Sequence, residues 1–452
     1  MTKLSVIGCG YLGAVHAACM AELGHEVIGL EVNAEKAAML SAGKPPFHEP
    51  GFEELLQHAT STGRLRFTTD VSAIASAQVH FICVGTPQQS GSYAADLTYV
   101  HAAVDSLLPR LAPHADGPVV VAGKSTVPVG TAEAIAQRLQ GEAPDAGATL
   151  VWNPEFLREG FAIQDTMSPD RIVYGLPSGE HTDQTTVAGQ AAREVLDEVY
   201  SDQLIRQGIP SVVTDYATAQ LVKVAANSFL ATKISFINSM AELCDATGAD
   251  VTQLAAAIGH DNRIGPKFLR AGVGFGGGCL PKDIRAFMAR AEELGAGETL
   301  GFLREVDAIN LRQRVRVVEL ARELSGGDLG GVRVAVLGAA FKPDSDDVRD
   351  SPALVVAEMI AAQGGDVVVT DPAALENVRR VRPDLAVEDD PIKAVTGAEV
   401  VLLLTEWRQY LDLDPAELGR HVVQRRMVDG RNALDPVDWR AAGWVYRGLG
   451  RP

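Results

Sequence analysis

Residues 3 to 33 of this 452-residue chain carry the pattern that most restricts its fold. An apolar run at residues 4–7 leads into Gly8-Cys9-Gly10-Tyr11-Leu12-Gly13, a helix-compatible stretch follows, and a second apolar run ends at Glu31, 18 residues after Gly13. Strand, glycine turn, helix and strand in this order are typical of a βαβ dinucleotide fingerprint. In such a turn Gly8 reverses the chain, Gly10 lets the backbone approach a pyrophosphate, and Gly13 allows the helix to pack closely on the strand.

Glu31 stands at the end of the second strand pattern, where a carboxylate can accept hydrogen bonds from the ribose hydroxyls of an adenosine. Because its charge would repel a 2′-phosphate, NAD is favoured over NADP. Lys36 nearby keeps NADP open as a minor alternative. The expected NAD site contains Gly8, Gly10, Tyr11, Leu12, Gly13, Glu31 and Lys36.

Further apolar runs end in turn residues at 79–87, 118–126 and 149–155. Near-continuous apolar strands that alternate with helical stretches predict a parallel sheet covered on both faces, which is an α/β fold. Ligands of such sheets bind at the carboxyl ends of the strands. Thr86, Thr126 and Glu155 fall at those ends and are therefore candidate site residues.

A long helix is predicted from about Tyr216 to Gly248, since residues 216–247 contain neither Gly nor Pro. Lys223 and Asn227 share one face of it with apolar side chains. A cation and an amide on an apolar stripe are costly unless something pairs with them. A lysine that extends to solvent beside a surface asparagine is the alternative interpretation.

The pattern of strands and helices in the C-terminal third of the chain predicts a second α/β domain. A linker-like stretch at 325–331 precedes a strand and turn at 332–343, and more strand patterns follow at 366–372, 399–405 and, last, near 422–428. The turn has Gly338 but no G-x-G-x-x-G spacing, so we do not expect a second dinucleotide bound in the same way. Lys342 and Arg431 are its candidates for an anionic ligand, and ordinary surface cations are the alternative.

Composition excludes several classes of function. A formal charge of −18 argues against nucleic acid or an anionic membrane as partner, because both select basic surfaces. The five cysteines are scattered without a C-x-x-C pair, so we expect reduced thiols and neither a disulfide framework nor a metal site. No run of 18 apolar residues and no signal-peptide pattern is present, and we expect a cytoplasmic protein.

One thiol, Cys279, lies in the glycine-rich run of residues 273–283. Pro281 suits the first turn of a helix, because its missing N–H would have no partner there. Cys279 would then lie at a helix N-terminus, where unpaired N–H groups and Lys282 favour the thiolate, and Asp283 on the same face could exchange protons beside the sulfur. The run indicates a nucleophilic cysteine, with a buried, inert cysteine as the alternative.

Six segments in collinear order resemble the UDP-glucose/GDP-mannose dehydrogenase family, most of all its bacterial UDP-glucose 6-dehydrogenases. They are the N-terminal fingerprint, residues 125–131, 153–160, the helix with Lys223 and Asn227, residues 274–283 and residues 341–344. The resemblance implies two Rossmann-like parallel-sheet domains joined by a central helical dimerisation domain. We place the NAD-binding domain at 1–209, the central domain at 210–313 and the nucleotide-sugar domain at 314–452.

The activity that the resemblance implies is the NAD-dependent, four-electron oxidation of the C6 alcohol of UDP-glucose to UDP-glucuronate, without a metal. Cys279 matches the nucleophile that holds the substrate as a thiohemiacetal and then as a thioester. Lys223 and Asn227 match the pair that stabilises the oxyanion at C6.

Three further catalytic roles follow from the same resemblance. Asp283 matches a proton-handling carboxylate, Thr126 a hydroxyl that orders a water, and Glu155 the carboxylate implicated in thioester hydrolysis. The division of labour among Asp283, Lys223 and Glu155 stays open. Gly278 departs from relatives that carry a side chain there, and we expect it to loosen the loop.

The remaining assignments concern binding, and Arg263 matches an arginine that reaches into the partner's site in a homodimer or higher homo-oligomer. The cofactor set gains Thr86, Thr126, Glu159, Lys282 and Arg349. The substrate set is Glu155, Phe156, Leu157, Lys223, Asn227, Arg263, Phe268, Phe275, Gly276, Phe341, Lys342 and Arg431.

Three alternatives remain open. A GDP-mannose or other UDP-hexose 6-dehydrogenase would share the whole catalytic set. A simple two-electron dehydrogenase would have no use for Cys279, and a dinucleotide-binding regulatory protein would not need the catalytic residues at all.

Overall fold

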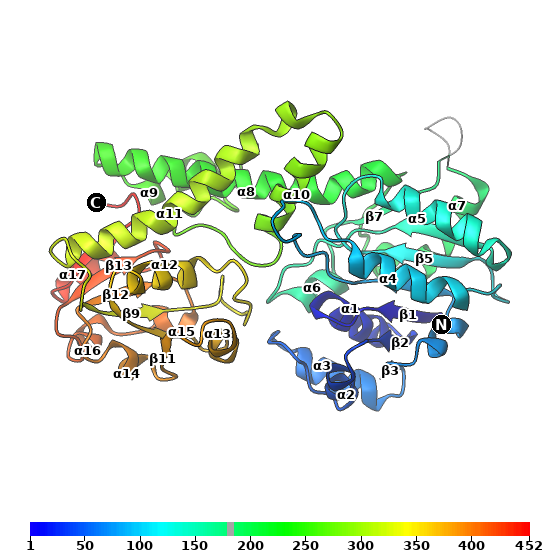
Figure 1. Ribbon diagram of the computed structural model, residues 1–452, viewed down its shortest axis with the longest axis horizontal. Coiled ribbons are helices and arrows are strands. Elements are labelled where there is room, and N and C mark those ends of the chain that lie inside the picture. The colour runs from blue at the N-terminus through cyan, green and yellow to red at the C-terminus, as the bar shows by residue number, and fades with distance from the viewer. Residues whose placement is uncertain (179–184) are drawn as a thin grey trace. The chain divides into compact units, whose positions relative to one another are not determined.

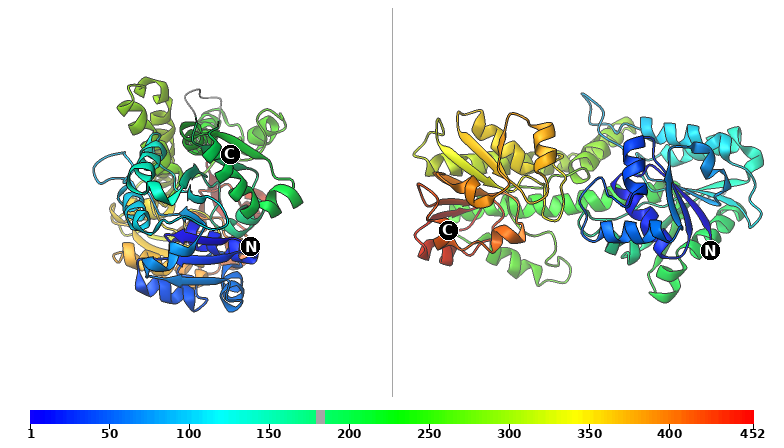
Figure 2. Two further views of the ribbon diagram at one scale, coloured as in Figure 1. Left: turned by 90° about the vertical axis from the view of Figure 1, so that its right-hand side faces the viewer. Right: turned by 90° about the horizontal axis from the view of Figure 1, so that it is seen from below.

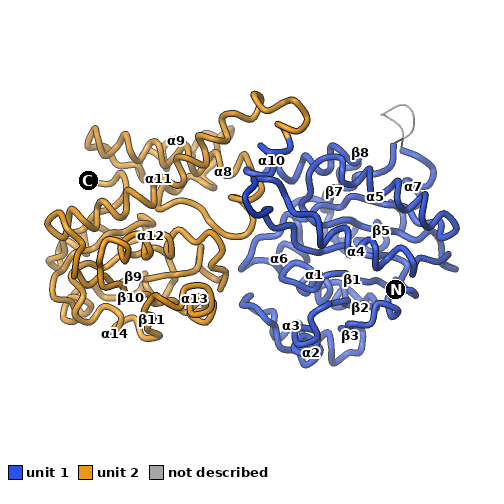
Figure 3. The backbone as a smooth tube through the Cα atoms, in the orientation of Figure 1, with its two compact units in different colours: residues 1–226, 285–290 blue, residues 227–284, 291–452 orange. Residues whose placement is uncertain are grey.

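The computed structural model describes residues 1–178 and 185–452, which form two compact units. Unit 1 comprises Met1–Ala226 and Arg285–Arg290, and unit 2 comprises Asn227–Ile284 and Ala291–Pro452 (Figure 3). Each unit contains one sheet with helices against it (Figures 1 and 2).

The sheet of unit 1 has eight strands in the order β3-β2-β1-β4-β5-β6-β7-β8. Neighbouring strands pair parallel, except β6 and β7, which pair antiparallel through Trp152 and Gly175. The strands are β1 (Lys3–Ile7), β2 (Glu26–Leu30), β3 (Leu65–Thr68), β4 (Val79–Ile82), β5 (Val119–Gly123), β6 (Ala148–Trp152), β7 (Ile172–Leu176) and β8 (Ser211–Asp215).

Two apolar cores cover the two faces of this sheet. On β5, Val120 belongs to one core and Val121 to the other, because successive side chains of a strand point to opposite faces. This arrangement explains the unbroken apolar runs that predicted a doubly covered sheet. The helices of unit 1 are α1 (Tyr11–Glu22), α2 (Ala34–Ser41), α3 (Phe52–Ser61), α4 (Thr98–Leu107), α5 (Thr131–Glu142), α6 (Ala162–Met167) and α7 (Val187–Val199).

Three strands of unit 1 were not predicted, and neither was the antiparallel pairing. Strands β3 and β8 lie at the two edges of the sheet, and each carries exposed or half-buried positions, so neither reads as a continuous apolar run. Strand β7 is fully buried, and the short apolar run Ile-Val-Tyr-Gly-Leu in its sequence is typical of such a strand.

The predicted long helix is α8 (Tyr216–Thr247), which begins in unit 1 and ends in unit 2. Gly248, with φ of 77°, terminates it and donates its N–H to the oxygen of Cys244 at 2.8 Å. Helices α9 (Val251–Gly259), α10 (Leu280–Glu293) and α11 (Phe302–Leu324) follow α8 before the sheet of unit 2.

The sheet of unit 2 has six parallel strands in the order β11-β10-β9-β12-β13-β14. The predicted last strand is β13, and one more, β14, follows it, so the prediction that the chain's strands end near 428 was wrong. The elements are β9 (Arg333–Leu337), α12 (Pro352–Ala361), β10 (Asp366–Thr370), α13 (Leu375–Val381), β11 (Ala386–Val387), α14 (Pro391–Val395), β12 (Val400–Leu403), α15 (Arg408–Leu411), α16 (Pro415–Leu418), β13 (Arg426–Asp429), α17 (Pro436–Ala441) and β14 (Val445–Gly448).

The turn after β9 differs from the turn after β1. Asp371 is buried, and its Oδ2 accepts hydrogen bonds from the main-chain N–H groups of Ala339 at 2.7 Å and Ala340 at 3.0 Å. Trp407 Nε1 donates to the same oxygen at 3.0 Å. A carboxylate of the chain therefore occupies the N–H groups that a dinucleotide pyrophosphate would need, which gives a physical reason to expect no second dinucleotide there.

Within residues 1–178 and 185–452, no helix is both long and apolar enough to cross a membrane. Over the same residues, no three His, Cys, Asp or Glu side chains gather as metal ligands would.

Candidate active site

The glycine turn after β1 has the geometry that a pyrophosphate requires. Gly8 has φ of 88°, and a Cβ on it would lie 2.6 Å from Cγ1 of Val84. A Cβ on Gly13 would lie 1.9 Å from the oxygen of Gly8, so no side chain fits where α1 packs on the turn. A Cβ on Gly10 would meet nothing within 4 Å, and this open side leaves room for a ligand.

Glu31 follows β2, and its carboxylate is buried and oriented by the main chain. Oε2 accepts from Cys9 N at 3.2 Å and Oε1 from Asn33 N at 2.9 Å. Each oxygen keeps acceptor capacity for a ribose hydroxyl. Lys36 is exposed on α2, whose first turn Asn33 caps. These residues fit an NAD site, and Leu12 packs against the core beneath the turn.

Tyr11, at the start of α1, is tied to a residue that the sequence prediction missed. Its hydroxyl donates to the carboxylate of Glu49 and accepts the N–H of Gly160 at 2.9 Å. Glu49 also accepts the N–H of Ala162 at 2.7 Å. Burial and the neighbouring Glu49 raise the pKa of Tyr11. In the sequence, Glu49 could have been noticed as the acidic residue within the turn-like run Pro-Phe-His-Glu-Pro-Gly at residues 46–51.

The hydroxyl residues at the carboxyl ends of the strands contact one another. Thr86 Oγ1, after β4, donates to the main-chain oxygen of Thr126, after β5, at 2.8 Å. Thr86 is buried and Thr126 is half-buried. The structure thus brings together two of the residues predicted from strand ends.

Lys223 and Glu155 form a buried ion pair, so the interpretation of Lys223 as a lysine that extends to solvent is wrong. Lys223 Nζ lies 3.1 Å from Glu155 Oε1, and the two side chains are 6% and 15% exposed. Leu157 N donates to the other carboxylate oxygen, and the ring of Phe156 lies 5.4 Å from Lys223 Nζ. Residues 155–157 and Lys223 therefore form one cluster in unit 1. Glu159 lies half-buried in the same segment.

Asn227, one turn after Lys223 on α8, also has a partner. Its Nδ2 donates to Asp283 Oδ2 at 2.6 Å, and Lys282 Nζ lies 2.5 Å from Asp283 Oδ1. Asp283 is only 1% exposed, and donors within unit 2 hold both of its oxygens. The costly polar positions on α8 are thereby explained, since each pairs with a predicted carboxylate.

Cys279 caps α10, as predicted. Its oxygen accepts the N–H of Asp283 at 2.9 Å, the helix starts at Leu280, and Pro281 lies in the first turn. The thiol is exposed, whereas the other four cysteines are buried. The interpretation of Cys279 as a buried, inert cysteine is therefore wrong.

The glycines before Cys279 have close neighbours, which for Gly276 include a main-chain oxygen and for Gly278 the end of a flexible side chain. A Cβ on Gly276 would lie 2.3 Å from the oxygen of Asp350, and one on Gly277 would lie 2.8 Å from the ring of Phe341. A Cβ on Gly278 would lie 2.3 Å from Cζ of Arg349, which also pairs with Asp347 at 2.7 Å. The guanidinium of Arg349 therefore fills the space that we expected to leave a looser loop.

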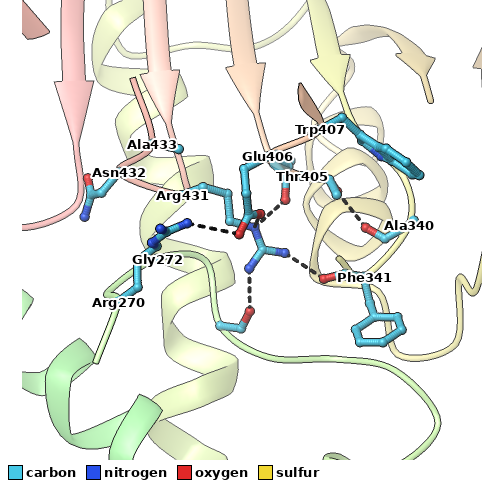
Figure 4. Close-up of polar contacts among 12 residues, drawn as sticks. Arg270, Gly272, Ala340, Phe341, Thr405, Glu406, Trp407, Arg431, Asn432 and Ala433 are labelled. Carbon is cyan, nitrogen blue, oxygen red and sulfur yellow. Dashed lines mark hydrogen bonds and ion pairs between the residues drawn. The ribbon is translucent and has the colours of Figure 1, made fainter. Parts of the chain in front are cut away.

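Phe275 and Arg431 attach this loop to the rest of unit 2. Phe275 exchanges main-chain hydrogen bonds with the side chain of Asn310, at 2.7 and 3.0 Å. Arg431 donates from Nε to the oxygen of Leu404 at 2.6 Å, from Nη1 to Gly274 at 3.1 Å and from Nη2 to Phe341 at 2.9 Å (Figure 4).

Arg431 also lies 3.4 Å from Glu406, which pairs with Arg270 at 3.5 Å. The Arg431 side chain is 12% exposed, and burial lowers its pKa, although Glu406 opposes that effect. It is therefore no ordinary surface cation. Lys342 lies beside this cluster, with Nζ 5.3 Å from the ring of Phe341.

Two predicted residues are not brought into these clusters. Arg263 is 89% exposed and pairs with Asp261 at 2.7 Å. Phe268 is 38% exposed and has φ of 62°.

Sequence comparisons identify the family to which these residues belong. Models of the UDP-glucose/GDP-mannose dehydrogenase family match residues 2–202 as the NAD-binding domain, 217–312 as the central domain and 335–436 as the UDP-binding domain. A UDP-glucose 6-dehydrogenase of Rhizobium meliloti is 39% identical over 451 residues, which cover 100% of both chains.

Two solved structures are similar over nearly the whole chain. A UDP-glucose dehydrogenase of Pyrobaculum islandicum has a TM-score of 0.87 at 38% identity, with 100% of this chain and 98% of that chain covered. A UDP-D-ManNAc dehydrogenase of Pyrococcus horikoshii has a TM-score of 0.84 at 25% identity, with 99% of each chain covered. The three family models and these likenesses over the full length lead to one conclusion: the chain belongs to the UDP-glucose/GDP-mannose dehydrogenase family.

Proposed function

We propose that this chain oxidises the C6 alcohol of UDP-glucose to the carboxylate of UDP-glucuronate, with two equivalents of NAD. The observation that carries the proposal is the exposed thiol of Cys279 at the N-terminus of α10. Asp283 lies in the first turn of the same helix and is held by Asn227 of α8. A thiol in this position suits covalent capture of an aldehyde, which a two-electron dehydrogenase would not need.

The first oxidation depends on the polar residues of α8. Lys223 and Asn227 are spaced by one helical turn, so both can present donors to the same substrate oxygen. Asp283 takes part in removing the proton of the C6 hydroxyl, together with Lys223 and a water ordered by Thr126. NAD supplies the hydride acceptor for each of the two oxidations.

The second oxidation depends on Cys279. The thiol adds across the C=O bond of the aldehyde, so that sulfur binds C6 and the oxygen gains the proton of a thiohemiacetal; loss of this proton and of a hydride from C6 then gives a thioester. Water then attacks the thioester carbon, the C–S bond breaks, and the carboxylate product and the thiol are released. Glu155 assists that attack, and Lys223, 3.1 Å from it, holds its carboxylate in place.

Binding residues complete the proposal. The NAD set includes Glu159, Lys282 and Arg349, and Phe275, Gly276, Phe341, Lys342 and Arg431 contribute to the sugar nucleotide site. Lys342 supplies the cation for the diphosphate. Arg431 donates three of its five guanidinium N–H groups to main-chain oxygens, and the other two are left for the sugar nucleotide.

A homodimer or higher homo-oligomer is part of the proposal. Phe229, Phe236 and Leu243 recur every seven residues along α8 and are 67%, 50% and 56% exposed. Apolar side chains at this period form one stripe on a helix and favour pairing with another helix. Arg263, which extends into solvent in a single chain, would then reach a partner's site. None of the five cysteines forms a disulfide, which supports a cytoplasmic location.

The test is the amount of NADH formed from limiting UDP-glucose with excess NAD, for the wild type and Cys279→Ser. We expect two NADH per UDP-glucose and loss of turnover in the variant. One NADH per substrate, or full activity of the variant, would favour the two-electron dehydrogenase. Turnover of GDP-mannose or another UDP-hexose in place of UDP-glucose would keep the mechanism and change the substrate, and no NADH from any sugar nucleotide would favour the regulatory protein.

A further inference from the structure

Lys124, directly after β5, is a buried cation that the proposed mechanism does not use. Its Nζ donates to Asn153 Oδ1 at 3.0 Å and to the Tyr200 hydroxyl at 3.3 Å. The rings of Phe81 and Tyr200 lie 5.7 and 5.8 Å from it. Within the described part of the chain, no carboxylate lies at ion-pair distance from Lys124. A buried ammonium group with neutral partners is costly for folding, so its presence calls for a role.

Asn153 is the residue through which Lys124 can act. The same Oδ1 accepts the Tyr200 hydroxyl at 2.8 Å, Nδ2 donates to the oxygen of Val173 at 2.9 Å, and the main-chain N–H donates to Gly123 at 2.8 Å. These bonds fix the side chain and the peptide of Asn153 between β5 and β7. Glu155 follows two residues later, after Pro154, whose ring restricts the chain between them.

Charges around Lys124 point toward Glu155 as well. Burial lowers the pKa of Lys124, while Cys83 and Glu155 act to raise it and Lys223 acts to lower it. Three further buried titratable groups interact with Lys124: burial raises the pKa of Cys83 and of Tyr200 and lowers the pKa of His16, so burial favours the neutral form of all three. Glu155 therefore lies within the electrostatic range of two lysines, one in direct contact and one held by Asn153.

We infer that Lys124 is a positioning residue for Glu155: by holding Asn153, it fixes the segment that places the Glu155 carboxylate for hydrolysis of the Cys279 thioester. This inference rests on the proposed function. It predicts that loss of Lys124 reproduces the specific defect of a Glu155 variant rather than a general loss of structure.

The experiment compares Lys124→Met with Glu155→Gln, the double variant and the wild type. Methionine fills a similar volume without charge or donor, and Lys124→Leu, which also lacks both, carries the test if Lys124→Met does not fold. Lys3→Met is the matched control, because Lys3 pairs with Glu26 at the surface of the same unit, 3.1 Å away. Rapid mixing with NAD and UDP-glucose measures the NADH burst and the steady-state rate, and intact-protein mass spectrometry measures the sugar nucleotide bound to Cys279.

For Lys124→Met we expect a burst of two NADH per site, a steady-state rate lower by about tenfold or more, and accumulation of the Cys279 adduct. The double variant should be no slower than Glu155→Gln, since residues that act on one step are not additive. Lys3→Met should match the wild type.

Equal losses of burst and steady-state rate without adduct, or independent effects in the double variant, would overturn the inference and leave Lys124 as a structural residue. A Lys124 variant with wild-type rates would do the same. If the wild type itself forms no NADH from UDP-glucose, the proposed function fails and the inference fails with it. Two NADH from the wild type together with an unaffected Lys124 variant refutes the inference alone.

Discussion

Replacing Arg431 with methionine should lower the free energy of unfolding of unit 2 by about 3–5 kcal/mol. The guanidinium donates to three main-chain oxygens, and hydrogen bonds from a charged donor contribute about 1.5–3 kcal/mol each. Methionine keeps much of the apolar stem but leaves Glu406 with Arg270 as its remaining cation, 3.5 Å away. The estimate lies below the simple sum because the freed carbonyl oxygens can bind water.

Tryptophan fluorescence during urea unfolding measures this change selectively. Trp407, Trp439 and Trp444 are buried in unit 2, and Trp152 is the one tryptophan of unit 1. With a urea dependence of about 2–3 kcal/mol per molar, the midpoint should fall by about 1–2 M. Measured at one protein concentration, the midpoints of variant and wild type are comparable even in an oligomer.

Arg408→Met is the matched control. Arg408 of unit 2 also pairs with a carboxylate, Asp412 at 2.8 Å, but its side chain is 84% exposed, so its loss should leave the midpoint unchanged. If Arg431→Met unfolds at the same urea concentration as Arg408→Met, the contacts to Gly274, Phe341 and Leu404 do not hold unit 2 together. An unchanged midpoint with a raised KM for the sugar nucleotide would instead make Arg431 chiefly a ligand of the substrate.

Four further substitutions test other parts of the structure. Gly10→Ala should raise the KM for NAD without changing the melting temperature, because its methyl group would point into open space where the pyrophosphate approaches. Gly13→Ala should instead lower the melting temperature, because its Cβ would lie 1.9 Å from the oxygen of Gly8. Equal effects of the two substitutions in thermal unfolding and in NAD titration would contradict this difference. Phe236→Glu should shift the protein toward the monomer in light scattering, and an unchanged mass would exclude the α8 stripe as the interface. Burial lowers the pKa of His80 from 6.5 to about 4, so between these values the unfolded chain binds a proton that the folded chain excludes. The free energy of unfolding should therefore fall by about 2 kcal/mol between pH 7 and pH 5. In urea unfolding, His80→Gln should show a smaller fall over that interval, and an equal fall would show that other groups cause it.

Several features could be predicted because neighbouring residues along the chain determine them. The turn between β1 and α1 needs a residue with positive φ at Gly8 and no side chain at Gly13, and both glycines are visible in the sequence. Helix α8 begins at the predicted residue and ends one residue before the predicted Gly248, since 32 residues without Gly or Pro lead to this terminating glycine. Cys279 could be placed at a helix start because Pro281 marks the first turn.

Other features depend on residues that are far apart in the chain. Lys223 was recognisable as a costly cation, but its partner Glu155 is 68 residues away, and Asn227 and Asp283 are 56 residues apart. Sequence periodicity gives the face of a helix and leaves open which strand end that face meets. The pairs exist because the order of strands in the sheet and the path of α8 bring their elements together.

What the sequence by itself determined was the glycine turn, the long helix, the cysteine at a helix N-terminus and the types of residue available for chemistry. These follow from backbone sterics and the periods of helices and strands, which act over a few residues. The tertiary structure alone decided that Lys124 holds Asn153, that Glu49 binds Tyr11, and that Arg431 serves carbonyl groups 157 and 90 residues away. The physical reason is that a buried polar group must find its partner wherever packing places one, and packing is a property of the whole unit.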